Sequence, residues 1–173
     1  LQIKKWYFFE ERIAELQNHF EDNEEEYITK LLVKAINLRF RADVPIGFNL
    51  SGGLDSSTLL ALIDQQNRDK STIETFTFIT NDERYDELYW VKSMLHKKPY
   101  PINVCELNHN EVPELALKIA KNQSEPYGGI PTIAYSKIFQ KASQKGIKVL
   151  LDGQGSEEAW AGYDYYVIIL KTT

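Results

Sequence analysis

Residues 44–57 decide the fold, and they run Val44-Pro45-Ile46-Gly47-Phe48-Asn49-Leu50-Ser51-Gly52-Gly53-Leu54-Asp55-Ser56-Ser57. They predict a short buried strand over 46–50, a tight Ser-Gly-Gly turn, and a helix that begins at Leu54 or Asp55. The two glycines let the backbone approach a ligand closely. The helix start offers free N–H groups and the positive end of the helix dipole, so the turn predicts an anion-binding site.

The same turn carries a carboxylate and hydroxyl groups, which can hold a metal ion or a phosphate. The alternative is a plain helix start in which Ser51 or Asp55 is the N-cap. The turn lacks the spacer and the Gly-Lys pair of a Walker A loop, and it is not a Gly-x-Gly-x-x-Gly dinucleotide motif. Without that lysine, nothing in the turn reaches over a γ-phosphate to assist its transfer.

On either side of this stretch, strand and helix patterns alternate along the chain. Strands are predicted over 46–50, 73–79, 102–107 and 148–151, and helices over 24–41, from 54, and over 85–94, 112–122 and 132–144. This alternation predicts an α/β fold: a parallel sheet of about four to five strands with helices on both faces. Ligands bind such sheets beyond the carboxyl ends of the strands, where strand order reverses. If the first and fourth strands are neighbours, the glycine-rich turns that follow them face each other across one crevice.

Composition narrows the class of protein. The chain has 173 residues, 43% of them hydrophobic, which is enough for one domain with a sizeable core. A net charge of −5 without a long basic stretch argues against nucleic-acid and membrane-surface partners. The one cysteine, Cys105, lies in an apolar run and is interpreted as a buried hydrophobic residue. Without a disulfide framework or a membrane-length apolar run, we expect a cytoplasmic protein.

Four stretches resemble known motifs. The Ser-Gly-Gly turn resembles the pyrophosphate loop of the ATP pyrophosphatases, which split ATP between its α- and β-phosphates. With the residues before it, from Arg41, it resembles the opening of the synthetase domain of the glutamine-hydrolysing asparagine synthetase family. Further matches are Tyr85-Asp86-Glu87, Glu125-Pro126 with Ile130-Pro131-Thr132, and Asp152-Gly153-Gln154-Gly155-Ser156-Glu157-Glu158-Ala159-Trp160-Ala161-Gly162-Tyr163. The last resembles the family's Ser-Gly-Glu-Gly-Ala/Ser-Asp-Glu-Leu-Phe-Gly-Gly-Tyr.

The resemblance implies a fold and an organisation. The fold is the three-layer sandwich typical of adenine nucleotide alpha-hydrolases. Residues 1–23 would be a linker with an aromatic segment, and residues 24–173 a partial synthetase domain whose later part, with a lysine that stabilises pyrophosphate, lies beyond Thr173. The full-length protein would also carry an N-terminal glutaminase domain, because the family's N-terminal cysteine nucleophile has no counterpart here. A homodimer is among the assemblies that the resemblance allows, and the fragment alone need not be active.

The resemblance also implies a reaction with ATP and Mg²⁺. A carboxylate, normally that of aspartate, attacks the α-phosphate and forms an acyl-adenylate and pyrophosphate. Ammonia from glutamine then displaces AMP, as in asparagine biosynthesis.

Site residues carry over position by position from the family's motifs. Backbone groups from Ser51 to Ser57 would hold pyrophosphate, and Asp55 and Glu157 would bind the metal. Leu50 and Phe78 would flank the adenine or ribose. The nucleotide-binding set is Leu50, Ser51, Gly52, Gly53, Asp55, Ser56, Ser57, Phe78, Asp152 and Gly153, and the catalytic set is Asp55, Gln154 and Glu157.

Two positions depart from the family pattern. Gln154 stands where the pattern has a glutamate, and an amide cannot accept a proton as a general base. Glu157 replaces a metal-binding aspartate and reaches one methylene further. Three alternatives follow: Glu157 or Glu158 acts as the base, the substrate is another carboxylate, as in β-lactam-forming or peptide-cyclising relatives, or the domain binds nucleotide without full activity.

Overall fold

The computed structural model describes residues 2–16, 23–66 and 73–160. The chain divides into two compact units, residues 1–38 and 39–173, and each is described by itself. The first unit holds α1, Phe9–Leu16, and all but the last residue of α2, Glu24–Arg39. Asn23 caps α2, because its Oδ1 accepts the Glu26 N–H at 3.2 Å.

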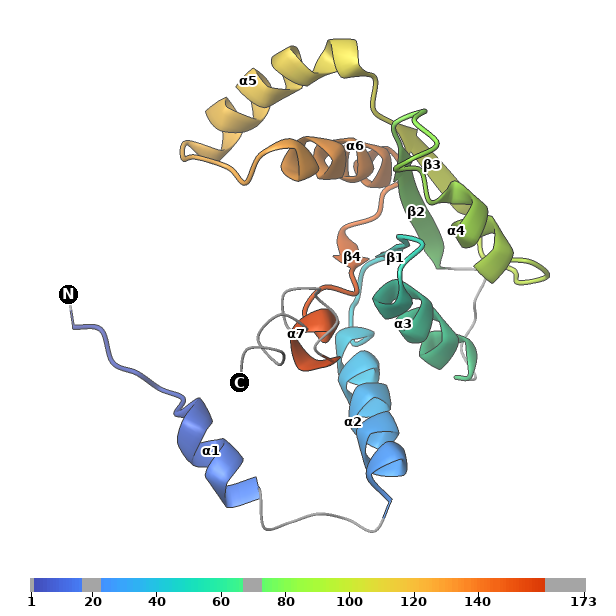
Figure 1. The fold of residues 1–173 in the computed structure, drawn as a ribbon. Helices are drawn as coiled ribbons and strands as arrows, with labels where there is room; N and C mark the ends of the chain where they lie inside the picture. The colour runs from blue at the N-terminus through green and yellow to red at the C-terminus, as the bar shows by residue number, and fades with distance from the viewer. Residues whose placement is uncertain (1, 17–22, 67–72, 161–173) are drawn as a thin grey trace. The chain divides into compact units, whose positions relative to one another are not determined.

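The second unit is built on a four-stranded sheet (Figure 1). Its strands are β1 Ile46–Asn49, β2 Glu74–Ile79, β3 Ile102–Glu106 and β4 Val149–Leu151. All neighbours are parallel, and the order is β3-β2-β1-β4. The chain steps outward from β1 to β3 and then returns to the far side of β1, so strand order reverses between β1 and β4. The prediction of a parallel α/β sheet is confirmed, with four strands.

Helices cover both faces of this sheet (Figure 1). One face carries α3, Leu54–Asp64, and α4, Leu88–Met94; the other carries α5, Val112–Gln123, and α6, Ile130–Gln144. Right-handed crossovers explain the division. The connections from β1 out to β3 place their helices on one face of the sheet. The connection from β3 back to β4 runs in the opposite direction and therefore places its helices on the other face. α6 packs on the sheet through a core of Phe76, Cys105, Ile138, Ala142 and Ile147. Cys105 is buried as predicted, and burial raises the pKa of its thiol.

Two helix starts differ from the sequence prediction. α4 begins at Leu88 rather than at Tyr85, because the preceding residues form a turn in which Asp86 Oδ1 accepts the Thr80 N–H at 2.6 Å. α6 begins at Ile130 rather than at Thr132, with a proline in its first turn, where the backbone N–H that proline lacks would have no partner within the helix. α6 ends as predicted, before Gly146 in the left-handed conformation with φ +74°.

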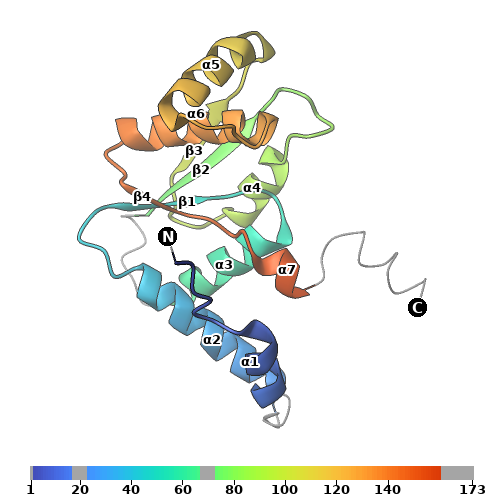
Figure 2. The same cartoon turned by 90° about the vertical axis from the view of Figure 1, so that its left-hand side faces the viewer.

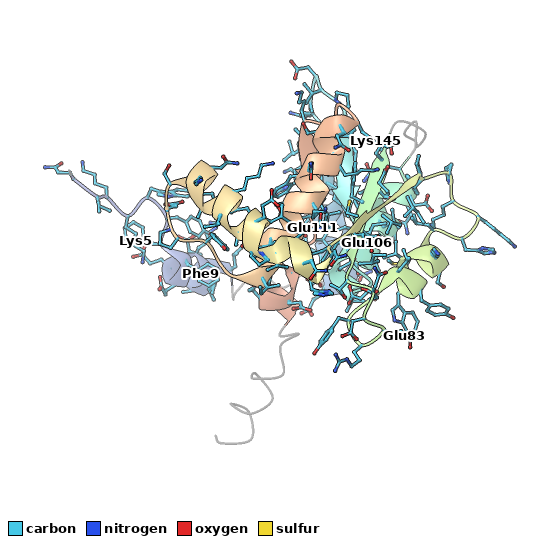
Figure 3. The ribbon with its side chains drawn as sticks, turned by 90° about the horizontal axis from the view of Figure 1, so that it is seen from above. Lys5, Phe9, Glu83, Glu106, Glu111 and Lys145 are labelled. Carbon is cyan, nitrogen blue, oxygen red and sulfur yellow. The ribbon has the colours of Figure 1, made fainter. Side chains whose placement is uncertain are left out.

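Polar side chains interact at the end of the sheet where the strands begin. Lys145 pairs with Glu74 at 3.0 Å, and Asn103 Nδ2 donates to the same carboxylate at 2.6 Å. Burial opposes the charged form of Glu74, but the hydrogen bonds from Asn103 and Lys145 outweigh it and lower its pKa. Figure 3 shows Lys145 far from Glu106, the last residue of β3. The carboxyl ends of the strands therefore lie at the opposite end of the sheet from the Lys145–Glu74 pair. Across the described ranges, no helix is long and apolar enough to cross a membrane.

Candidate active site

The turn after β1 exposes the start of α3. Gly53 is the N-cap, with φ −76° and ψ 166°, and no described side chain caps the helix. Ser56 Oγ donates to the Ser51 carbonyl at 2.7 Å and Ser57 Oγ to the Gly53 carbonyl at 2.6 Å, so these hydroxyls tighten the turn itself. The alternative in which Ser51 or Asp55 caps α3 does not describe this turn. The N-terminal amides of α3 remain suited to an external anion.

The turn after β4 has a similar construction. Asp152 Oδ1 accepts the Gln154 N–H at 3.2 Å, and Ser156 Oγ donates to the Gly153 carbonyl at 3.1 Å. A short helix, α7, Ser156–Trp160, follows directly. Aspartate commonly stabilises a turn in this way, with its carboxylate accepting the backbone N–H two residues later in the chain.

The two turns meet across the reversal point, as expected once β1 and β4 are neighbours. Asn49 Nδ2 donates to Asp152 Oδ2 at 2.7 Å, and the Glu157 N–H donates to Asp55 Oδ2 at 3.2 Å. A Cβ added to Gly153 would lie 3.0 Å from the Ser56 amide nitrogen, so the two backbones are in close contact. Figure 2 shows α7 beside the first turn of α3.

A cavity of about 440 Å³ opens where the two turns meet. Its lining residues are Asn49, Ser51, Gly53, Leu54, Asp55, Ser56, Tyr135, Asp152, Gly153, Gln154, Gly155, Glu157 and Glu158. Four of these carry carboxyl groups, and within the described part of the chain no lysine or arginine lines the cavity. A bare polyanion would be repelled by the carboxylates, so a phosphate ligand fits here best as its complex with a cation.

Most of the predicted site residues line this cavity, namely Ser51, Gly53, Asp55, Ser56, Asp152, Gly153, Gln154 and Glu157. Leu50, Gly52, Ser57 and Phe78 are outside the described lining. Leu50 is 1% exposed and its N–H donates to the Phe76 carbonyl at 2.8 Å, so both its side chain and its N–H are engaged inside the domain. The Phe78 side chain packs against the core under α5 and α6.

Tyr135, on α6, is a lining residue that the sequence did not reveal. Its hydroxyl accepts a hydrogen bond from Gln154 Nε2 at 3.0 Å. Burial, and then the nearby charge of Asp152, raise the pKa of Tyr135, which keeps the phenol protonated. Nothing in the helical pattern around Tyr135 distinguishes it from an ordinary core aromatic.

Asn49 was also missed, although the sequence carries a signal for it. It is 8% exposed and ends an otherwise apolar strand. A polar side chain buried in such a strand requires a hydrogen-bond partner, which is the Asp152 carboxylate. A buried amide before a glycine-rich turn therefore indicates a contact with a neighbouring loop.

The acidic residues of the cavity can be tested as a metal site. Among the residues that the structure describes, no group of three or more His, Cys, Asp or Glu side chains is arranged to hold a metal ion. Mg²⁺ needs fewer protein ligands than that, because it is usually held by one or two carboxylates together with waters and substrate phosphates. Asp55 and Glu157 both line the cavity and fit that pattern.

Comparisons with known proteins extend this description. The family model "Asparagine synthase" matches residues 27–172. A putative glutamine-hydrolyzing asparagine synthetase of Methanocaldococcus jannaschii is 31% identical over an alignment of 169 residues that covers 94% of this chain. The amidase chyE of Penicillium rubens is 24% identical over 86% of the chain, and asparagine synthetase 1 of Bacillus subtilis 24% over 84%. The chain spans 31%, 24% and 22% of the lengths of these relatives.

A solved structure agrees with the fold. The NH3-dependent NAD synthetase of Campylobacter jejuni superposes with a TM-score of 0.52 at 14% identity, over 80% of this chain and 60% of the other. At that identity the likeness concerns the fold alone, and it agrees with the predicted adenine nucleotide alpha-hydrolase-like architecture.

Proposed function

The chain belongs to the asparagine synthase family, and from that premise we propose that it is the ATP-binding part of a ligase that activates a carboxylate as an acyl-adenylate. The observation that carries the proposal is the pairing of β1 with β4, which puts the two glycine-rich turns on one cavity. A single turn would provide an anion cradle, whereas two facing turns can hold the phosphates and the reacting carboxylate together.

The Ser51–Ser56 turn is proposed to bind the β- and γ-phosphates. The N-terminal amides of α3 supply N–H donors and the positive end of a helix dipole, which stabilise the charge that develops on departing pyrophosphate. The turn has no lysine to assist transfer of the γ-phosphoryl group, so cleavage between the α- and β-phosphates is favoured.

The proposed reaction has two steps. A carboxylate oxygen of the substrate attacks the α-phosphorus, and the bond from that phosphorus to the oxygen bridging to the β-phosphate breaks, which releases pyrophosphate. Ammonia then attacks the acyl carbon, the acyl–oxygen bond breaks, and AMP leaves with its electron pair. One proton of the attacking nitrogen must pass to an acceptor.

Asp55 and Glu157 are proposed to hold Mg²⁺ together with phosphate oxygens of ATP, which suits two carboxylates in a cavity without described cationic side chains. When bound, the metal ion neutralises negative charge on the phosphates and on the leaving pyrophosphate. Asp55 also accepts the Glu157 N–H, so its side chain links the two positions that we propose to bind the metal.

Aspartate is the proposed carboxylate and glutamine the proposed source of ammonia, by relation to the family. Gln154 favours a second candidate, a ligase acting on another carboxylate, because its amide cannot take the proton from the attacking nitrogen. Two amidases among the relatives are consistent with variation of the substrate within the family. The cavity keeps two glutamates, Glu157 and Glu158, as proposed proton acceptors.

Isotope exchange between pyrophosphate and ATP tests this proposal. The complete protein that contains these residues is assayed with Mg²⁺ and a panel of amino acids and other carboxylic acids. Exchange that depends on aspartate supports an asparagine synthetase, and exchange that depends on another acid supports the second candidate. ATP binding without exchange for any acid would show that the domain binds nucleotide without this chemistry.

A further inference from the structure

The Ser51–Gly53 turn is held from outside the cavity by a residue to which the proposed function gives no role. The Gly52 N–H donates to Glu87 Oε2 at 2.8 Å. Neither residue is among the described residues that line the cavity. This N–H is therefore directed toward α4, and Glu87 binds the turn on the side away from the proposed phosphates.

The backbone of the turn lies directly against the start of α4. A Cβ added to Gly52 would come within 2.8 Å of Glu87 Cβ and 2.9 Å of Trp90 Cβ. Only a residue without a side chain allows this approach, which explains a glycine at this position in physical terms. The contact consequently fixes the distance between the turn and α4 as well as the direction of one N–H group.

Glu87 is itself firmly placed. Asp86 Oδ1 accepts hydrogen bonds from the Thr80 N–H at 2.6 Å and from the Thr80 hydroxyl at 3.1 Å, which ties the residue before Glu87 to the end of β2. The Glu87 carbonyl accepts the Val91 N–H at 3.1 Å and so belongs to the first turn of α4. These contacts fix the backbone at Glu87, from which its carboxylate reaches the glycine turn.

We propose that Glu87 is a positioning residue for ATP: its carboxylate holds the Ser51–Gly53 turn in the conformation that presents the α3 amides to the phosphates. This inference rests on the proposed function. A carboxylate repels phosphate, so its contribution comes from ordering the turn before the nucleotide binds. Preorganisation reduces the conformational entropy that binding would otherwise lose.

Two variants of Glu87 separate its charge from its hydrogen-bond acceptor. Glu87→Gln keeps an oxygen that can accept the Gly52 N–H, whereas Glu87→Ala removes the acceptor. In pyrophosphate exchange by the complete protein, we expect Glu87→Ala to raise KM for ATP by about five- to tenfold with kcat within about twofold, a loss of the size expected for one ordinary hydrogen bond. Glu87→Gln should remain within about twofold of the parent in both constants.

Glu83→Ala is the matched control, because it removes an exposed carboxylate from the same connection between β2 and α4 (Figure 3). It should leave KM for ATP unchanged, and thermal melting should show that all three variants fold. An unchanged KM in Glu87→Ala, or a Glu87→Gln variant as impaired as Glu87→Ala, would overturn the inference.

Pyrophosphate binding by calorimetry keeps this inference separate from the proposed function. If the parent protein shows no exchange, the proposed chemistry fails, but binding of pyrophosphate with Mg²⁺ is still measured in the parent and in both variants. Weaker binding by Glu87→Ala alone supports the positioning role, and equal binding by all of them, or none by the parent, contradicts it.

Discussion

Asn49 Nδ2 lies 2.7 Å from Asp152 Oδ2, and this hydrogen bond ties the last residue of β1 to the first residue after β4, 103 positions later in the chain. Asn49 is buried, so its amide needs this partner, and Asp152 is thereby fixed beside the turn that begins at Ser51. Asp152 also accepts the Gln154 N–H, which orders the second turn. One carboxylate therefore sets the position of each turn relative to the other.

Gly153→Ala should weaken ATP binding, because the new methyl group would lie 3.0 Å from the Ser56 nitrogen and force the two turns apart by a few tenths of an ångström. We expect KM for ATP to rise by about fivefold or more, with a stability loss of about 1–3 kcal/mol as for other overpacked sites. The control is Gly128→Ala, whose methyl group would meet Thr132 Oγ1 at an ordinary 3.5 Å. Equal KM values for the two variants would argue against close contact of the turns in the working site.

Asp55→Asn should abolish pyrophosphate exchange while the protein stays folded. The asparagine oxygen can still accept the Glu157 N–H, so the contact between α3 and α7 survives, whereas the charge proposed to bind Mg²⁺ is lost. Exchange rates and melting temperatures are measured together. Asp82→Asn, which removes a carboxylate paired with Arg84, should keep the parental rate. Parental exchange by Asp55→Asn would remove Asp55 from the metal site.

Gln154→Glu should accelerate the second step and leave the first one nearly unchanged. It introduces a group that can accept a proton at the position where the related family pattern has glutamate. Formation of the amide from ammonia is followed by chromatography, and adenylation by exchange. We expect amide formation to rise by about a hundredfold, the lower end of the range for one general base. If the amide forms no faster than in the parent, the proton acceptor lies elsewhere, with Glu157 and Glu158 as the remaining candidates.

Tyr100 should make stability fall at alkaline pH. Burial and the carboxylate of Asp64 raise its pKa to about 12. The folded state thus holds the phenolic proton more tightly than the unfolded state, where the pKa is about 10. This stabilisation is complete below pH ~10 and is lost as pH rises toward ~12.

Melting temperatures of the parent and Tyr100→Phe, measured from pH 7 to 11.5, check this expectation. The phenylalanine variant lacks the hydrogen bond to Asp64 and should melt a few degrees lower at pH 7. Above pH ~10 the gap between the two should narrow. Tyr89→Phe, at an exposed tyrosine, serves as the control. A gap that is constant over the whole range would contradict the raised pKa.

The sequence was sufficient for the architecture because its signals there are local. The periodicity of the hydrophobic residues and the content of β-branched residues indicate the strands. The Ser-Gly-Gly turn directly follows β1 in sequence, so its position does not depend on the rest of the sheet. The sequence did not show that β1 and β4 are neighbours. It showed only that, if they are, the glycine-rich turns that follow them face each other at the carboxyl ends of the parallel strands. Helix starts were less well predicted: side-chain contacts such as that of Asp86 with Thr80 decide that α4 begins at Leu88.

The parts of the site that sequence reasoning missed depend on distant contacts. Tyr135 enters the cavity only because α6 packs over β2, and Glu87 meets Gly52 only because α4 lies beside the turn. The proposed contact of Phe78 with the nucleotide stays a prediction; its partly buried side chain packs against the core residues of α5 and α6. The direction of a side chain depends on packing between elements that are distant in sequence, which local motifs do not report.

The products formed from ATP test the central claim most directly. The complete protein is incubated with Mg²⁺, ammonia or glutamine, the carboxylic acid that supports exchange, and ATP labelled in the α- and γ-phosphates, and the labelled products are separated. Cleavage at the cavity between the two turns predicts AMP and pyrophosphate in equal amounts, with amide formed in step. Release of ADP and inorganic phosphate would contradict the account, because it would mean transfer of the γ-phosphoryl group.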